Sequence, residues 1–236
     1  MQPAQLFSPF LGGASFELLA AAMGWKVAGT DASPDVVAFW RTLLKSPEEL
    51  ADAVQQHYPP SREDFCALQQ KKFTNDFDKA VALFVCNRSS FGGSTYSGGY
   101  CLGRFTQASI NRLRTFTAPN LDVKSAQDFR VSIPQHPNDY LYLDPPYPGV
   151  NGCLYGRGGA LHKAFDLRAH EDLRDLLKGR EGVMLSYPDL PEIHRWYRNW
   201  TFVTIQFSWG IGLQKLGREL LILSPDLAAL VQNSTE

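Results

Sequence analysis

A short apolar and aromatic run, Tyr140 to Leu143, is followed at once by Asp144-Pro145-Pro146-Tyr147. The run predicts a buried strand. Proline has no backbone N–H and cannot donate to a strand ladder, so the strand must end before Pro145. We therefore predict a stiff loop at the carboxyl end of a strand, which is where open α/β sheets bind their ligands.

The groups of this loop suit chemistry on the amino group of a flat base. Such an amino group is a weak nucleophile, because its lone pair is conjugated with the ring. Asp144 and the carbonyl of Pro145 could both accept its N–H bonds, while Tyr147 stacks on the base and Pro146 shapes the loop. A base reaches such a pocket only after it has left the duplex. The alternative is an ordinary strand-ending turn, and the four residues alone leave the two interpretations equally weighted.

Composition and length are those of an ordinary globular protein. The 236 residues suit one large domain, or one domain with an inserted lobe. No apolar run is long enough to span a bilayer, and the start, Met1 to Gln5, carries no lysine or arginine of the kind that opens a secretory signal. The cysteines form no CxxC pair and the histidines are scattered. We therefore expect a cytoplasmic protein with free thiols, no membrane partner and no metal.

The charge distribution is uneven along the chain. A net charge of −1 argues mildly against a nucleic-acid partner. Residues 79–121, however, contain no Asp or Glu, and aromatic residues are interleaved with the basic ones, Lys79, Arg88, Arg104, Arg112 and Arg114. This pattern favours a local positive surface for phosphates over the alternative, a lobe that happens to lack acids.

The N-terminal part predicts a strand–turn–helix–strand unit. A strand over Gln5 to Phe10 leads into a turn with Gly12 and Gly13, after which Ser15 is expected to cap a helix over Phe16 to Met23. A second strand, Lys26 to Thr30, ends at Asp31. In Rossmann-like folds the glycine turn lets a cofactor approach the backbone, and the acid takes ribose hydroxyls. The glycines do not form GxGxxG, so a nucleoside cofactor without pyrophosphate fits better. The alternative for Asp31 is a simple cap of the next helix.

The middle of the chain predicts an inserted, mainly helical lobe. Helical spacing runs over Asp35 to Lys45, and a broken helical segment follows, in which Ser61 and Asp64 form a capping signal. A loop rich in Gly, Ser and Tyr, residues 87–100, precedes another helix over Phe105 to Leu113. We therefore expect residues 1–44 and 118–236 to form the catalytic domain and residues 45–117 to form a target-recognition lobe.

The C-terminal part predicts the remaining strands and one long helix. Strands are expected at Leu121 to Val123 and Val183 to Ser186, and Asp166 is expected to cap a helix that ends before Gly179. Two late strands, residues 201–207 and 219–223, read as an antiparallel pair.

Taken together, these motifs resemble those of the Dam-like (D12-class) adenine-specific DNA methyltransferases, in their bacterial or phage branch. The resemblance extends from Phe7 to about Ser224. The segments that carry it are, in order, Pro9-Phe10-Leu11-Gly12-Gly13-Ala14-Ser15, Asp31, Asn87-Arg88-Ser89-Ser90-Phe91-Gly92-Gly93, Asp128-Phe129 and Asp144-Pro145-Pro146-Tyr147. Branch features are Ser97-Gly98-Gly99-Tyr100, Arg104-Phe105-Thr106, Leu154-Tyr155-Gly156 and Leu161-His162-Lys163-Ala164-Phe165-Asp166.

The resemblance implies a Rossmann-like, S-adenosylmethionine-dependent sheet and methyl transfer to adenine N6 in double-stranded DNA. It implies catalytic roles for Asp144, Pro145, Pro146 and Tyr147. The cofactor residues that it implies are Pro9, Phe10, Leu11, Gly12, Gly13, Asp31, Asp128 and Phe129, and the DNA contacts are Asn87, Arg88, Tyr100 and Arg104.

One family feature is missing from the sequence. Related sequences open with a Gly-Gly-Lys segment that closes over the methionine end of the cofactor, and no such segment is present here. We therefore expect a partner chain or a longer natural start to supply it. The alternatives are a methyltransferase that acts on RNA or another amino group, and a catalytically impaired DNA-binding homologue.

Overall fold

A seven-stranded mixed sheet organises the molecule. The computed structural model describes residues 5–148, 160, 165–208 and 216–233. The strand order is β3-β2-β1-β4-β5-β7-β6. The strands are β1 (Gln5–Ser8), β2 (Lys26–Gly29), β3 (Leu121–Val123), β4 (Tyr140–Leu143), β5 (Val183–Pro188), β6 (Thr201–Ser208) and β7 (Leu216–Leu223). The first five are parallel in the sheet, and β7 runs antiparallel between β5 and β6. The predicted α/β fold and the late antiparallel pair are confirmed.

The strands alternate between two apolar layers. Leu6 faces one core cluster and Phe7 the other, and Tyr140 and Leu141 divide in the same way. This period of two is what a pleated strand imposes. Because the central strands are covered on both faces, they read as nearly continuous apolar runs.

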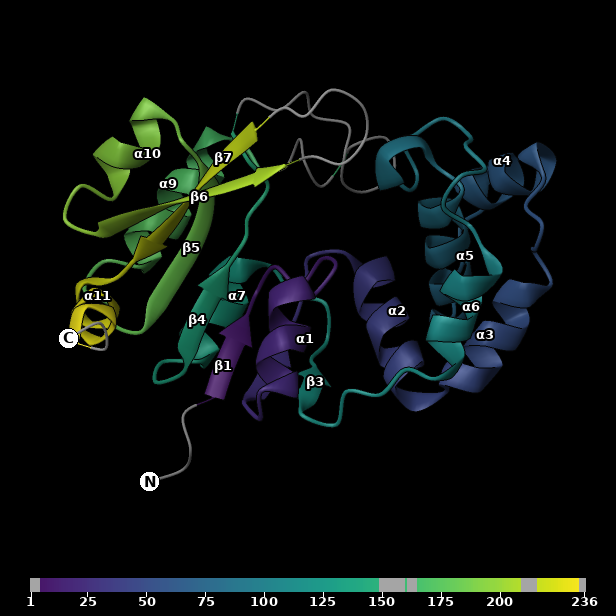
Figure 1. Cartoon of the computed structure of the whole chain (residues 1–236), viewed down its shortest axis with the longest axis horizontal. Helices are drawn as coiled ribbons and strands as arrows, with labels where there is room; N and C mark the ends of the chain where they lie inside the picture. Colours follow the sequence, from purple (N-terminus) through teal and green to yellow (C-terminus); the bar gives the residue numbers. More distant parts are fainter. Residues whose placement is uncertain (1–4, 149–159, 161–164, 209–215, 234–236) are drawn as a thin grey trace.

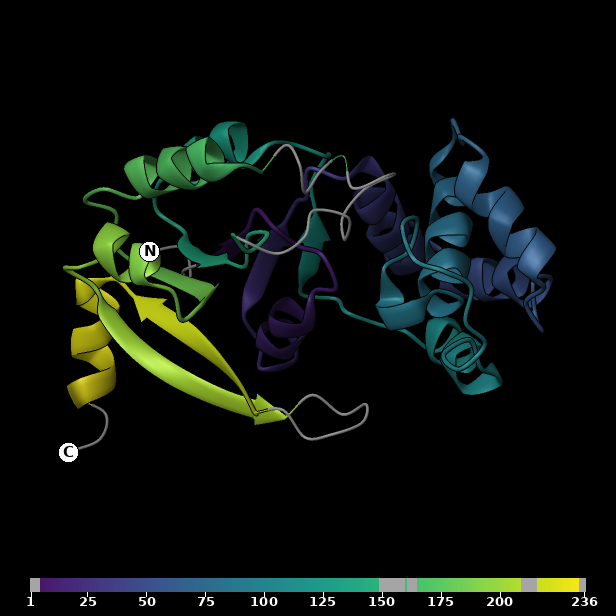
Figure 2. The same cartoon turned by 90° about the horizontal axis from the view of Figure 1, so that it is seen from above.

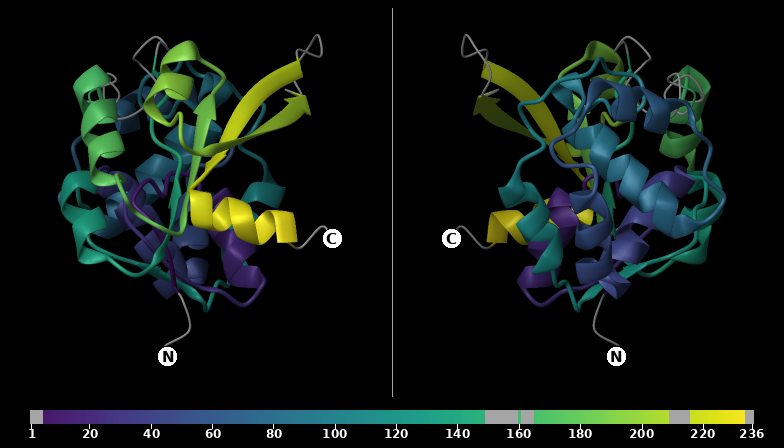
Figure 3. Two further views of the ribbon diagram at one scale, coloured as in Figure 1. Left: turned by 90° about the vertical axis from the view of Figure 1, so that its left-hand side faces the viewer. Right: turned by 90° about the vertical axis from the view of Figure 1, so that its right-hand side faces the viewer.

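Helices cover both faces of the sheet. The helix α1 (Ser15–Ala22) packs with the first layer, and α7 (Phe129–Ser132), α9 (Leu167–Leu176) and α10 (Pro191–Trp196) pack with the second. Figure 3 shows the sheet between α7 and α9 on one side and α1 and the last helix, α11 (Pro225–Asn233), on the other. In the described part of the chain, no helix is long and apolar enough to cross a bilayer.

A group of helices stands beside the sheet (Figures 1 and 2). It comprises α2 (Pro34–Lys45), α3 (Pro47–Gln55), α4 (Arg62–Gln70), α5 (Asp76–Arg88) and α6 (Gln107–Arg114), with a single 3-10 turn, η1 (Phe91–Gly93). The helix α2 packs against α5, and one apolar cluster continues from β1 and β2 into this group. The assignment of residues 45–117 to a separate recognition lobe therefore remains a proposal.

Helix starts follow the caps that the sequence predicts, with one exception. Ser61 accepts a hydrogen bond from the N–H of Asp64, and Asp166 accepts one from Ala169. The expected cap at Ser15 is wrong, because Ala14 occupies the N-cap position with φ 51° and no side chain caps α1. The tight turn after β1 imposes this left-handed backbone. The branch features at 154–156 and 161–164 lie outside the described residues.

Candidate active site

The site lies where the strand order reverses. β1 and β4 are adjacent and parallel, and the chain extends from them in opposite directions across the sheet. A crevice forms outside the carboxyl ends of the strands at such a point. In Figure 1 the arrows of β1 and β4 point toward the upper side of the molecule. The turn after β1 and the Asp144 loop after β4 therefore meet.

A cavity of about 330 Å³ opens at this point. Its walls come from residues 9–17, from 31–33 after β2, from Asp128–Arg130, and from Tyr142, Asp144 and Pro146. Val36, Leu83, Thr95, Tyr96 and Phe165 complete the lining. All eight residues expected to bind the cofactor thus border one cavity with the expected catalytic carboxylate. The expected DNA contacts do not border it.

The glycine turn is tied to the acid at the end of β2. The Gly12 N–H donates to Asp31 Oδ2 at 2.9 Å, and the Ser33 N–H donates to Oδ1 at 2.8 Å. Gly12 has φ +42°, and no atom lies within 4 Å of the place where a Cβ would stand. Ser33, not Asp31, caps α2 through the Val36 N–H. Asp31 is thus held beside an open stretch of backbone and retains free lone pairs.

Three phenyl rings form an apolar wall of the cavity. Phe10, Phe129 and Phe165 lie with their ring centroids 5.4–5.6 Å apart. The Arg130 guanidinium lies 4.5 Å from the Phe129 centroid and pairs with Asp128. The wall can hold a flat apolar group, and Asp128 fixes the arginine at its edge.

The loop of residues 144–147, which is expected to be catalytic, has some residues at the cavity and others in the protein interior. Asp144 and Pro146 line the cavity, whereas Pro145 is buried. Asp144 is exposed on one side but largely surrounded by protein, and this desolvation raises its pKa to about 6. The Tyr147 hydroxyl makes a hydrogen bond of 3.0 Å with Ser186 Oγ and a very short one with the Glu219 carboxylate. Its ring is half-buried at the side of the loop.

Sequence reasoning missed two acids and one aromatic residue at this site. Glu17, in the first turn of α1, is 2 % exposed and lines the cavity. Burial raises its pKa to about 7, and the charges of Asp144 and Asp31 act in the same direction. Tyr142 lines the cavity and stacks on Phe16 at a centroid distance of 4.0 Å. Burial, and then the Asp144 charge, raises the pKa of Glu219. Of these three residues, only Tyr142 could have been found from the sequence, because it lies two residues before Asp144 on the predicted strand and alternates in direction with its neighbours.

The expected DNA-binding residues lie at the end of α5, which holds Asn87 and Arg88, and on the loop that follows it, which holds Tyr100 and Arg104. The Asn87 side chain donates to the Gly93 carbonyl at 2.8 Å, and the Tyr100 hydroxyl donates to the Pro60 carbonyl at 2.6 Å. Arg104 is exposed and Arg88 is half-buried. Burial, and then the charges of Arg112 and Arg104, lowers the pKa of Arg88. The structure thus brings three arginines together and uses the polar groups of Asn87 and Tyr100 inside the protein.

Comparison with protein families agrees with this geometry. The family model for D12 class N6 adenine-specific DNA methyltransferases matches residues 2–209. The chain belongs to this family. The methyltransferase therefore methylates adenine N6 in DNA, as the sequence resemblance implied. A search of curated proteins finds no match to the chain.

The family implies S-adenosylmethionine as the methyl donor, and the cavity has the features that this donor requires. Its adenine needs a flat apolar wall, its ribose needs hydrogen-bond acceptors, and its two positive groups need carboxylates. The phenyl rings could meet the first need and Asp31 the second. Asp144 and Glu17 add carboxylates to the lining, and Glu17 Oε1 is buried without a hydrogen-bond partner among the described residues. Among the described residues, no cluster of His, Cys, Asp or Glu could hold a metal ion.

Proposed function

We propose that the methyltransferase binds S-adenosylmethionine in the cavity between β1 and β4 and receives a flipped adenine at Asp144. The observation that carries this proposal is the single cavity that the glycine turn, Asp31, the phenyl wall and Asp144 all border. When bound, S-adenosylmethionine supplies an activated methyl group on a sulfonium. Asp31 would bind the ribose, and Phe10 and Phe129 would enclose the adenine of the cofactor.

Asp144 would make the amino group of the flipped base nucleophilic. Its carboxylate and the Pro145 carbonyl would each accept one N–H bond of N6 and draw the lone pair out of conjugation. Positive charge develops on N6 during transfer, so a nearby carboxylate stabilises the transition state more than the ground state. The remaining rate enhancement comes from positioning of the base, because two prolines fix the loop that holds it.

Tyr147 would stack on the flipped base. Its hydroxyl is fixed by Ser186 and Glu219, so the ring has a defined orientation beside Asp144. A ring held in advance loses little side-chain entropy when the base arrives. Pro146, which lines the cavity, would separate the place of the flipped base from the place of the cofactor.

DNA would be held by the arginine cluster that Arg88, Arg104 and Arg112 form. Burial, and then the charges of Arg112 and Arg104, lowers the pKa of Arg88, and the repulsion within the cluster is relieved when phosphates approach. Asn87 and Tyr100 would act by shaping the loop that carries Arg104. We further propose a cytoplasmic location, where free thiols such as those of Cys66 and Cys101 persist.

The test is a methyl-transfer assay on unmethylated double-stranded DNA with labelled S-adenosylmethionine, followed by digestion to nucleosides. Label is expected in N6-methyladenine and should fall at least about 1000-fold in Asp144→Ala, which should still bind the cofactor. Asp189→Ala, an exposed acid outside the cavity, is the matched control and should retain activity.

Three results would contradict the proposal. An unchanged rate in Asp144→Ala would remove Asp144 from the chemistry. No label from a folded protein that binds DNA would contradict methyl transfer by this chain on its own. Label in a different nucleoside or in RNA would redefine the substrate.

A further inference from the structure

Glu17 is a buried carboxylate to which the mechanism above gives no role. It is the third residue of α1, is 2 % exposed, and borders the cavity beside Phe16 and Tyr142. An acid in the first turn of a helix is ordinarily explained by the helix dipole and sits at the surface. Burial removes that explanation, because a buried carboxylate costs free energy unless something pairs with it.

The protein itself only partly satisfies this carboxylate. The Ser8 hydroxyl and the N–H of Glu17 favour its charged form, but Oε1 has no hydrogen-bond partner among the described residues. No described ion pair includes Glu17. The charges of Asp144 and Asp31, which act on Glu17, are of the same sign as its own. Such an atom is satisfied best by a cationic donor that enters the cavity.

The described lining of the cavity is short of positive charge. Four of the described lining residues are carboxylates: Glu17, Asp31, Asp128 and Asp144. The one cation in the described lining is Arg130, which pairs with Asp128 and with Asp172 at its rim. Glu17, Asp31 and Asp144 are therefore left for a ligand that carries positive charge and hydroxyl groups.

We propose that Glu17 binds the α-ammonium group of the methionine part of S-adenosylmethionine. The inference rests on the proposed binding of that cofactor in this cavity. The cofactor has two positive centres, a sulfonium and an ammonium. Only the ammonium has N–H donors, and the unmet need of Glu17 Oε1 is for a donor. Asp31 is already assigned to the ribose and Asp144 to the adenine amino group.

The test compares three ligands by titration calorimetry on the full chain. S-adenosylmethionine carries both positive centres, S-adenosylhomocysteine carries only the ammonium, and 5′-methylthioadenosine carries neither. Glu17→Gln should weaken the first two by a similar factor of about 10–100, the size of a lost charge-assisted hydrogen bond. It should change the affinity for 5′-methylthioadenosine less than about 2-fold. Glu192→Gln, which changes a first-turn acid of α10 away from the cavity, should alter none of the three.

Each other pattern overturns the proposal. A loss for S-adenosylmethionine alone would place Glu17 at the sulfonium, and an equal loss for all three ligands would give it a structural role only. Unchanged affinities would show that Glu17 does not bind the cofactor, although the cofactor site itself would stand. Failure of the unaltered protein to bind any of the ligands would instead overturn the proposed function. Glu17→Leu, a neutral residue of similar size, repeats the test if Glu17→Gln does not fold.

Discussion

At the scale of single residues, the carboxylates of the cavity cost the methyltransferase stability. Burial raises the pKa of Glu17 to about 7 and that of Asp144 to about 6. A raised pKa means that the folded state binds the proton more tightly than the unfolded chain. The stability that each acid contributes is therefore lost as the pH rises from its unfolded pKa, near 4, through its folded pKa. Acids retained at such a cost mark a functional site.

Glu17→Gln should accordingly stabilise the ligand-free protein at pH 8. The neutral amide removes a charge that is almost fully buried, and we expect a gain of roughly 1–3 kcal/mol in the free energy of unfolding. At pH 5 both side chains are neutral in the folded state, so most of this gain should vanish. Urea unfolding at the two pH values measures it. A variant less stable than the unaltered protein at pH 8 would show that Glu17 is paired within the fold.

The pH dependence of methylation tests the state of Asp144. Only the carboxylate can accept the N–H bond of adenine, so the rate should be low below pH 6 and rise to a plateau above it, with the inflection near the pKa of about 6. Single-turnover rates at saturating cofactor and DNA measure the profile. Glu17→Gln should keep this inflection, because its own group titrates near pH 7. A rate that falls with rising pH would require a protonated Asp144.

Tyr147 should act through its ring rather than its hydroxyl. The hydroxyl binds Ser186 and Glu219, away from any base, so Tyr147→Phe is expected to keep the rate of methylation within about 5-fold. Tyr147→Ala removes the stacking surface and should lower the rate by about 10- to 100-fold, as one base–aromatic stack contributes about 1–3 kcal/mol. Equal losses in both variants would assign the hydroxyl a direct role.

At the scale of elements, the loop after α5 is held by hydrogen bonds rather than by an apolar core. Asn87 donates to Gly93 and to the hydroxyl of Thr95, and Gln69 donates to the carbonyls of Thr95 and Gly98. Thr95 has φ 53°, a left-handed backbone that β-branched residues rarely adopt. These bonds maintain the strained turn that brings Thr95 and Tyr96 to the cavity.

Asn87→Ala should therefore weaken DNA binding without altering its salt dependence. The variant loosens the loop but removes no positive charge, so the plot of log affinity against log salt should keep its slope while shifting downward by about 10-fold. Fluorescence anisotropy over a range of salt concentrations measures both quantities. A lower slope would mean that Asn87 positions an arginine for contact with a phosphate. An unchanged affinity would show that the loop does not contribute to DNA binding.

The elements and motifs of the site could be predicted where local chemistry decides them. Two prolines end β4, glycines mark the turn after β1, and Ser61 and Asp166 cap their helices. Glu219 could not be predicted, because its contact with Tyr147 depends on the register of β7, in which it pairs with Pro188 of β5. Glu17 was missed for a similar reason, since helical spacing does not show which acid a cavity will bury.

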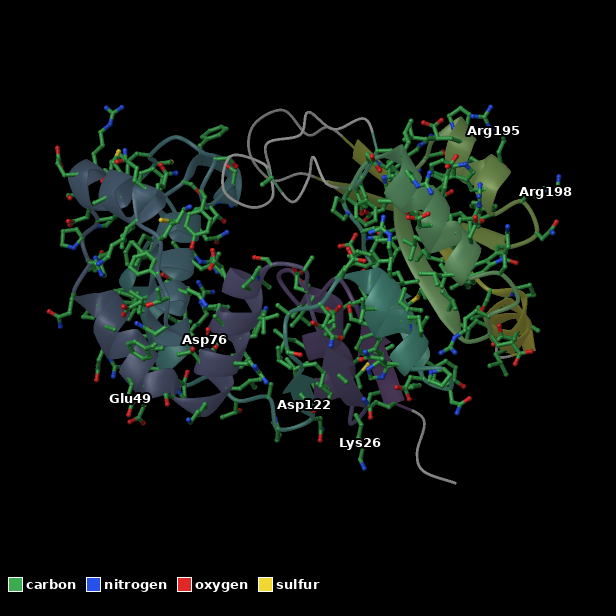
Figure 4. The ribbon with its side chains drawn as sticks, turned by 180° about the vertical axis from the view of Figure 1, so that it is seen from behind. Lys26, Glu49, Asp76, Asp122, Arg195 and Arg198 are labelled. Atoms are coloured by element: carbon green, nitrogen blue, oxygen red, sulfur yellow. The ribbon has the colours of Figure 1, made fainter. Side chains whose placement is uncertain are left out.

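At the scale of the whole molecule, three arginines form a local positive cluster in a protein whose net charge is close to zero. The chain has a net charge of −1, yet Arg104 and Arg112 lie close enough to Arg88 to add to the effect of burial in lowering its pKa. In Figure 4, by contrast, Glu49, Asp122 and Lys26 lie along the lower edge of the molecule, and Arg195 and Arg198 lie at the outer edge of the sheet. DNA affinity should then depend on the cluster, not on total charge.

Salt dependence measures how many of these arginines reach phosphate. If the three of the cluster each neutralise one phosphate, the slope of log affinity against log salt should be about −2.7 or steeper. Arg88→Ala and Arg104→Ala should each reduce its magnitude by about 0.9, and the double variant by about 1.8. Arg198→Ala removes the same charge from the outer edge and should leave the slope unchanged. If Arg198→Ala lowers the slope as much as Arg88→Ala does, total charge and not the cluster governs binding, and the DNA path must be sought across the sheet instead.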